Sequence, residues 1–150
     1  MRIIIQRVSE ASVRIEGKVS AQIGPGLLIL LGIIEGDTQE DIDWLVGKMT
    51  RMRIFADDDG KMNKCLRDTN GELLVVSQFT LHASTRKGNR PSFIKAARPE
   101  TAIPLYQAFL KTAQDVTGKA CASGEFGADM QVSLVNDGPV TIMIDSRLRE

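Results

Sequence analysis

The sequence predicts an α+β domain built on a curved, barrel-like sheet, largely antiparallel or mixed, with two amphipathic helices packed on one side. Three observations favour this fold class. Apolar strand-like segments outnumber helical ones, most of them follow one another directly as hairpins, and strands and helices do not alternate along the chain. The lack of alternation disfavours a doubly wound parallel fold.

Four strands are expected before the first helix. Apolar residues run or alternate in them as strands require, and the expected ranges are 3–8, 11–15, 19–23 and 27–34. Leu27–Ile34 is apolar without a break, which is typical of a central strand covered on both faces. Glu16-Gly17 and Gly24-Pro25-Gly26 supply the turns on either side of the third strand.

Two segments have apolar residues at helical spacing. The first follows Asp37 and Thr38, both good N-caps. Its buried stripe is expected to be Ile42, Leu45, Val46, Met49 and Met52. The second covers 102–116, with Thr101 as its cap and Pro104 in the first turn.

The second half of the chain holds the remaining strands. Leu73–Phe79, 130–134 and 140–144 have strand patterns, and Asn136–Pro139 is expected to interrupt the last two. The polar segment 81–98 is too long for a simple connection, and long loops often carry function.

The composition is that of one ordinary globular domain, expected to span residues 1–150. Hydrophobic residues make up 43% and charged residues 25% of the chain. Nineteen basic residues balance nineteen acidic ones, so no overall basic field attracts nucleic acid. No signal peptide is recognisable, and the longest apolar run is far below the ~20 residues of a membrane-spanning helix. A cytoplasmic protein is expected.

Neither a metal nor another cofactor is expected. One histidine, His82, and two distant cysteines, Cys65 and Cys121, cannot supply the clustered ligands of a zinc site. The acidic run Asp57–Gly60 is reminiscent of a calcium loop, but Lys61 falls where such a loop needs an oxygen ligand. A hairpin turn is the preferred interpretation.

Ser77-Gln78-Phe79-Thr80, at the end of an apolar strand, is the first candidate site. Its hydroxyls, its amide and its backbone N–H groups are the parts needed to hold a carbonyl and the oxyanion that forms when the carbonyl is attacked. Ser and Thr at a strand end also commonly satisfy the backbone of a turn. From the residues alone, that simpler interpretation is favoured.

Gly138-Pro139, within Asn136–Thr141, is the second candidate. A Gly-Pro pair between strands is usually only a turn. Gly138 has no side chain and Pro139 has no N–H, so such a loop can present bare carbonyl oxygens to a ligand. Carbonyl oxygens are suitable acceptors for an ammonium group.

A basic segment follows the first candidate site. Residues 73–99 hold no Asp or Glu, and their positive charges are Arg86, Lys87, Arg90, Lys95 and Arg98. A solvated loop is the simpler interpretation, yet this segment is the one best suited to attract phosphates. His82 has the chemistry of a general base near neutral pH, but no triad partner is recognisable.

Taken together, these motifs resemble the D-aminoacyl-tRNA deacylases of the bacterial and eukaryotic type. The resemblance spans the chain and rests on Ile5-Gln6-Arg7-Val8, Val76–Leu81, Gly88–Phe93, Phe126–Met130 and Asn136–Thr141. It implies a homodimer of curved-sheet subunits that hydrolyses the ester joining a D-amino acid to tRNA. That reaction clears mischarged tRNA.

The resemblance also implies a role for each candidate residue. The catalytic pocket would be Ser77–Thr80, with main-chain N–H groups holding the ester carbonyl. Gly138-Pro139 matches a cis Gly-Pro element that the partner subunit inserts into that pocket, and Arg7 would brace it. Phe126 and Met130 match positions that line the pocket.

The resemblance leaves tRNA binding to the basic segment, where Arg86, Lys87 and Arg90 are the candidates for phosphate contacts. His82 falls at a position that varies in the family, which lowers its catalytic standing. An aminoacyl ester is already activated and the ribose 2′-hydroxyl can help to activate water, so no protein nucleophile is required. The role of Thr80 therefore stays open.

Chirality can be read by the main chain if Gly138 and Pro139 carbonyls hold the ammonium group while the N–H groups hold the ester carbonyl. A wall on one side then rejects every L side chain. Glycine has no side chain to reject, so glycyl-tRNA is an expected second substrate.

Two other interpretations remain open. In one, the chain is a non-catalytic RNA-binding or structural dimer in which both motifs only shape turns, and catalytic turnover distinguishes it from an enzyme. In the weaker one, the chain is a peptidase or general esterase with Thr80 or Ser77 as nucleophile, although no base is recognisable.

Overall fold

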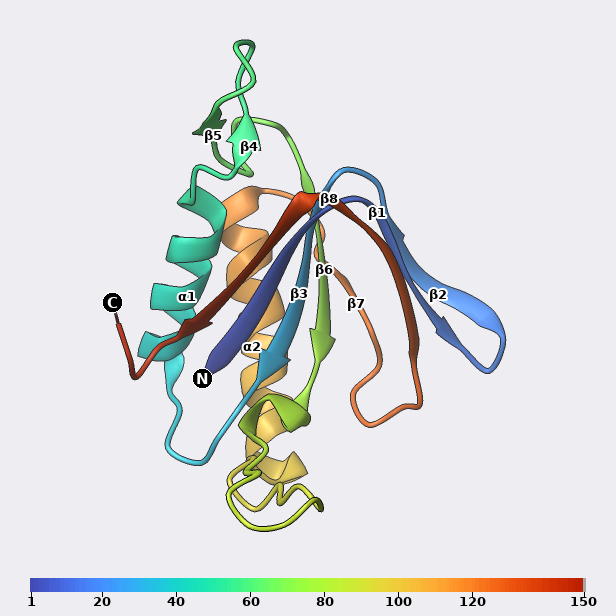
Figure 1. Cartoon of the computed structure of the whole chain (residues 1–150), viewed down its shortest axis with the longest axis vertical. Coiled ribbons are helices and arrows are strands. Elements are labelled where there is room, and N and C mark those ends of the chain that lie inside the picture. The colour runs from blue at the N-terminus through green and yellow to red at the C-terminus, as the bar shows by residue number, and fades with distance from the viewer. Residues whose placement is uncertain (150) are drawn as a thin grey trace.

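The computed structural model describes residues 1–149 and has the expected α+β architecture (Figure 1). The strands are β1 (Arg2–Ile15), β2 (Lys18–Ile23), β3 (Gly26–Gly32), β4 (Phe55–Ala56), β5 (Met62–Lys64), β6 (Glu72–Ser77), β7 (Ala122–Ser123) and β8 (Gln131–Asp145). The helices are α1 (Gln39–Arg51), the 3₁₀ helix η1 (Phe79–His82) and α2 (Pro99–Thr117).

The long strand β1 organises the main sheet. It pairs antiparallel with β3 along its first half, with β2 along its second half and with β8 along nearly its whole length. Strand β3 pairs parallel with β6, and β6 pairs parallel with β7. The sheet is therefore mixed, and it curls into a nearly closed, barrel-like form with α1 and α2 on one side (Figure 1). The predicted curved sheet is confirmed.

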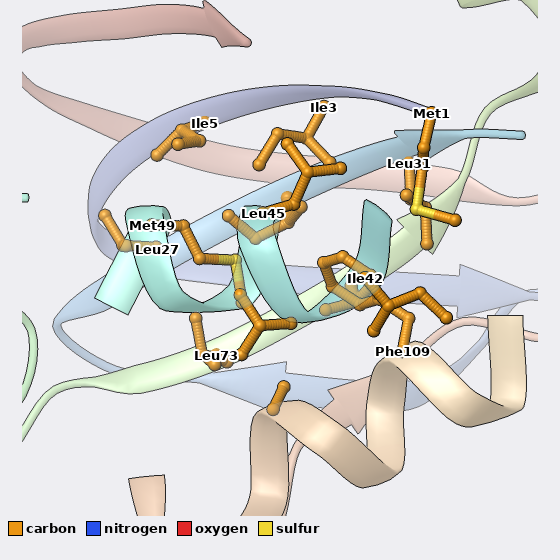
Figure 2. Close-up of a cluster of buried hydrophobic side chains, with 14 of the residues drawn as sticks. Met1, Ile3, Ile5, Leu27, Leu31, Ile42, Leu45, Met49, Leu73 and Phe109 are labelled. Atoms are coloured by element: carbon orange, nitrogen blue, oxygen red, sulfur yellow. The ribbon is translucent and has the colours of Figure 1, made fainter. Parts of the chain in front are cut away.

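Both faces of the central strands are buried. The cluster beneath α1 and α2 includes Ile3, Ile5, Leu27, Leu31, Ile42, Leu45, Met49, Leu73 and Phe109 (Figure 2). The cluster on the opposite face consists of Val8, Ala11, Val13, Ile23, Leu28, Leu74 and Val76. Leu27 and Leu28 thus enter different clusters, as the strand period of two requires. This explains why β3 is apolar without a break, and each buried aliphatic side chain contributes about 1.5–3 kcal/mol.

Helix α1 begins at Thr38, but Asp37 is not part of the cap. The Thr38 N–H donates to the Asp41 carboxylate at 2.8 Å, as in a capping box. The buried Asp37 carboxylate instead accepts from the α-ammonium group of Met1 at 2.7 Å and from the N–H of Ile34 at 2.9 Å. Asp37 is thus engaged in an ion pair across the fold, which local sequence does not reveal.

Helix α2 begins three residues earlier than predicted. Pro99 occupies its first position, where a missing N–H costs nothing. Thr101 is therefore not the cap; its hydroxyl donates to the Glu35 carboxylate at 3.1 Å. Pro104 lies inside the helix rather than in its first turn, where it removes one intrahelical hydrogen bond.

Three strand boundaries differ from the predictions. Strand β6 ends at Ser77, and Phe79 already belongs to η1. Strand β1 is continuous where two strands were expected, with shifts of register near Val8. Strand β8 is also continuous, but Gln6 pairs with Thr141 and Val8 with Asn136. Residues 137–140 therefore bulge out opposite a single residue of β1.

The acidic run forms the predicted hairpin turn between β4 and β5. The Asp57 carboxylate accepts the N–H groups of Asp59 at 3.0 Å and Lys61 at 2.9 Å. Among residues 1–149, no three His, Cys, Asp or Glu side chains are grouped to hold a metal ion. No helix in the described chain is long and apolar enough to span a membrane.

Candidate active site

The first candidate motif forms a sharp turn where β6 passes into η1. The Gln78 N–H donates to the Leu31 carbonyl at 2.7 Å, and the Gln78 side chain donates to the Thr80 hydroxyl at 2.5 Å. The N–H groups of Phe79 and Thr80, at the start of a helix, have no intrahelical acceptor. Within residues 1–149 no other hydrogen-bond acceptor is found for either. Both are available to bind an oxygen atom.

A cavity of about 80 Å³ lies beside this turn. It is lined by Leu31, Ile33, Ser77, Gln78, Phe79, Ala97, Ala102, Phe126 and Gly127. Apolar side chains from β3 and α2 form its wall, while the motif supplies its polar edge. Ser77, Gln78 and Phe79 line the cavity, whereas Thr80 follows them outside its lining. An apolar cavity beside a hydroxyl and free N–H donors has the parts that can stabilise an oxyanion.

The structure separates the two predicted lining residues. Phe126 lies at the cavity and packs against Tyr106, with ring centroids 6.0 Å apart. Burial raises the pKa of Tyr106 to about 12, and its hydroxyl donates to the Val75 carbonyl at 2.9 Å. Met130 packs instead over Gly124, in the cluster enclosed by the curled sheet. A role for Met130 in substrate binding stays a prediction.

The basic segment borders the cavity. The Phe79 side chain is 56% exposed and packs edge-on against Phe93, with ring centroids 5.1 Å apart. Ser84 and Ser92 form a β-bridge that closes an exposed arm, and this arm carries Arg86, Lys87 and Arg90. Three exposed cations thus lie on a short arm next to the candidate site.

The His82 side chain packs against Gly32 of β3 and, within the described residues, makes no hydrogen bond to the Thr80 hydroxyl. Its ring packs on Gly32, where a Cβ atom would come within 3.0 Å of it. Burial, aided by the charge of Arg2, lowers the pKa of His82 and favours its neutral form. Its Nε2 has no hydrogen-bond partner in the described chain. His82 therefore packs the turn against β3, and no contact couples it to the hydroxyl.

The second motif is held by Arg7. The Arg7 guanidinium donates to the carbonyls of Ile54 at 2.6 Å and Asp137 at 2.9 Å, and only 12% of its side chain is exposed. The Gly138-Pro139 peptide bond is cis, and Gly138 has a φ of +132° that suits only glycine. A Cβ atom on Gly138 would lie 2.7 Å from the Arg7 guanidinium.

One chain keeps the two motifs apart. Ser77 pairs with Leu31 and Leu31 with Ile3, whereas Gly138-Pro139 bulges opposite Arg7, four residues further along β1. Four residues span about 13 Å along the strands and three strand spacings add about 14 Å across them, so the motifs lie about 20 Å apart when measured along the sheet. Figure 1 shows η1 at the bottom of the sheet and the middle of β8 at the top.

Comparison with known proteins gives one consistent result. A family model described as D-Tyr-tRNA(Tyr) deacylase matches residues 4–145. The D-aminoacyl-tRNA deacylase of Akkermansia muciniphila is 65% identical over 150 residues, which is all of both chains. That of Flavobacterium johnsoniae is 60% identical over the same length. The chain belongs to the D-aminoacyl-tRNA deacylase family.

Solved structures share the deacylase fold. The c-Myc DNA Unwinding Element Binding Protein superposes with a TM-score of 0.90 at 40% identity, covering 97% of this chain and 98% of its own. A probable eukaryotic D-amino acid tRNA deacylase superposes with a TM-score of 0.81 at 18% identity, covering 95% and 97%. The solved structures confirm the fold, while the family model and the relatives confirm the family resemblance and the assignment as a hydrolase.

Sequence inspection missed much of the deacylase cavity wall. Ile33, Ala97, Ala102 and Gly127 line the cavity, but in the sequence they resemble ordinary core or loop residues. Of the residues that line the cavity, only Ser77, Gln78, Phe79 and Phe126 were predicted. Ile54, which holds Arg7 through its carbonyl, had no signal at all, because any residue presents the same backbone oxygen.

Proposed function

We propose that the chain hydrolyses the ester bond of D-aminoacyl-tRNA, a chiral proofreading step of cytoplasmic translation, and that glycyl-tRNA is a second substrate. The observation that carries the proposal is the pair of free N–H groups of Phe79, which lines an apolar cavity, and of Thr80, the next residue along the chain. An ester carbonyl bound there acquires two donors where negative charge develops.

In this proposal the substrate supplies part of the chemistry. The ribose 2′-hydroxyl lies next to the ester and helps to activate the attacking water. Water adds to the carbonyl carbon, and the tetrahedral intermediate expels the ribose oxygen, which is protonated to give free tRNA and a D-amino acid. Thr80, held by Gln78, positions the ester or the water without forming a covalent bond.

The proposed active site is composite, with Ser77–Thr80 from one chain and Gly138-Pro139 from the other. The separation of about 20 Å within one chain supports this, because a single chain cannot place both motifs on one small ester. In a two-fold symmetric dimer each chain inserts its Gly138-Pro139 into the other chain's pocket, so both pockets are completed at one interface.

The composite site explains chiral selection. Carbonyls of Gly138 and Pro139 bind the α-ammonium group, and the N–H groups of Phe79 and Thr80 bind the carbonyl. With both groups fixed, an L side chain is directed at the cavity wall and a D side chain away from it. Because only main-chain groups recognise the substrate, the identity of its side chain does not affect binding, and many D-amino acids are accepted.

The exposed arm is proposed to bind tRNA phosphates through Arg86, Lys87 and Arg90. Replacing Arg86 and Lys87 with Ala is expected to lower the slope of log affinity against log salt by about 0.7–0.9 for each phosphate that is no longer neutralised. The D/L preference stays unchanged. Lys18→Ala/Lys111→Ala, with the same charge change at exposed positions elsewhere, serves as the control. An unchanged slope in the Arg86/Lys87 variant would make the arm an ordinary solvated loop.

Turnover separates the enzyme from a non-catalytic RNA-binding dimer. With D-tyrosyl-tRNA in excess, the purified protein is expected to release many equivalents of D-tyrosine, and glycyl-tRNA is expected to be hydrolysed as well. The measurement is the number of amino acids released per chain. Binding of tRNA without release would favour the non-catalytic alternative.

A further inference from the structure

A large surface hollow lies outside the proposed active site. It measures about 430 Å³ and is lined by Trp44, Gly47, Lys48, Arg51 and Met52, here called the Trp44 patch. A groove of about 270 Å³ shares part of this lining and extends along β8 to Met143. Neither the ester chemistry nor the reading of chirality uses this surface.

The Trp44 patch combines an aromatic ring with uncompensated positive charge. The Lys48 ammonium lies 5.6 Å and the Arg149 guanidinium 5.0 Å from the centroid of the Trp44 ring. Arg149 is paired with Glu40 at 3.1 Å. In the described chain, no carboxylate lies within 4 Å of the cationic groups of Lys48 or Arg51. An aromatic ring beside cations without acidic partners suits a nucleic acid strand, whose phosphates pair with the cations while a sugar or base packs against the ring.

The C-terminal end of the Trp44 patch, at Met52, lies near the second motif. Met52 is followed two residues later by Ile54, whose carbonyl accepts from Arg7. Arg7 also donates to Asp137, the residue before Gly138. Figure 1 shows the C-terminal end of α1 and the middle of β8 at the top, with η1 at the bottom. The Met52 end of the patch therefore lies close to the element proposed to enter the partner's pocket, while the adjoining groove runs along β8 in the other direction to Asp145.

We propose that the Trp44 patch binds the tRNA whose aminoacyl ester occupies the partner subunit's pocket. The inference rests on the composite site proposed above. Lys48 and Arg51 contact phosphates, and the half-buried Trp44 ring packs against a sugar or an unpaired base. A second protein copy fits less well, because an interface there would bury two cations that have no acidic partner.

The first test removes the charge. Lys48→Ala/Arg51→Ala changes two side chains of the patch, with Lys18→Ala/Lys111→Ala as the control for total charge. KM for D-tyrosyl-tRNA is expected to rise about threefold to tenfold, and the salt slope is expected to fall by about 0.7–0.9 for each phosphate that is no longer neutralised. Hydrolysis of D-tyrosyl-adenosine, which has no tRNA phosphates, reports on the pocket alone and is expected to stay within about twofold of the unmodified protein.

The second test shows which subunit supplies the patch. A chain blocked at its pocket by Ser77→Leu/Thr80→Leu is combined in mixed dimers with a chain carrying Lys48→Ala/Arg51→Ala. The one open pocket then faces an intact patch on the blocked chain, and a normal KM for tRNA is expected. Placing all four substitutions on the blocked chain, opposite an unmodified one, is expected to raise KM.

Three results would overturn the inference. They are an unchanged KM and salt slope in the Lys48/Arg51 variant, an equal change in the control variant, and a loss of dimers, which would make the patch a subunit contact. Failure of the proposed function gives a different result, because the unmodified protein would then hydrolyse neither the tRNA nor the adenosine ester. Failure of the composite site alone would show as activity that does not depend on dimerisation.

Discussion

D-tyrosyl-tRNA is expected to be hydrolysed about 1000-fold faster than L-tyrosyl-tRNA, on the basis of a steric conflict of about 4 kcal/mol between an L side chain and the cavity wall. The two substrates share the same tRNA and the same side chain, so the ratio of kcat/KM values isolates chirality. The measurement is single-turnover deacylation followed for both isomers at one pH.

Glycyl-tRNA is the internal control for this ratio. It has the ammonium and the ester of the D substrate but no side chain, and its rate is expected to lie well above that of the L isomer. Equal rates for D- and L-tyrosyl-tRNA would show that the main chain does not fix both groups. A general esterase would give that result.

Removal of the ribose 2′-hydroxyl is expected to slow hydrolysis about 100-fold or more, the typical contribution of a group that assists proton transfer. The substrate is D-tyrosyl-tRNA with a terminal 2′-deoxyribose that carries the ester on its 3′ oxygen. Thr80→Ala is expected to cost less than about tenfold, because Gln78 and the backbone N–H groups remain. Single-turnover rates compare the two changes directly.

Thr80→Ser is the matched control, since it keeps the hydroxyl that Gln78 contacts. If Thr80 were a nucleophile, Thr80→Ala would abolish hydrolysis while the 2′-deoxy substrate would still acylate the protein. Isolation of an aminoacyl ester on Thr80 would therefore overturn substrate assistance.

Much of the fold could be predicted because the spacing of apolar residues along the chain reflects which face of a strand or helix is buried. The break-free run of β3 indicated a strand covered on both faces, and the stripe from Ile42 to Met49 indicated one face of α1. Helix ends were less predictable. Asp37 and Thr101 have good capping chemistry, yet Met1 and Glu35, distant in sequence, bind them instead. Such partners come from tertiary structure, which capping propensity does not include.

The candidate site could also be predicted only in part. The residues alone favoured ordinary turns at Ser77–Thr80 and Gly138-Pro139, and it was the resemblance to the deacylase family that made both motifs candidate site elements. Apart from Phe126, the apolar wall was not predicted, because residues such as Ile33 and Ala97 resemble core residues. The side-chain pattern also could not show that the two motifs lie about 20 Å apart in one chain, since that distance follows from strand register.

The central claim is that two chains build each active site, and mixed dimers test it most directly. One chain carries Ser77→Leu/Thr80→Leu, the other Gly138→Ala/Pro139→Ala, and each is expected to form an inactive dimer by itself. After random exchange of equal amounts, about half of the dimers are mixed, and each mixed dimer has one intact site. Activity is expected to recover to about a quarter of the unmodified level. If both motifs acted within one chain, every site would keep a defect, and no activity would return despite demonstrated exchange.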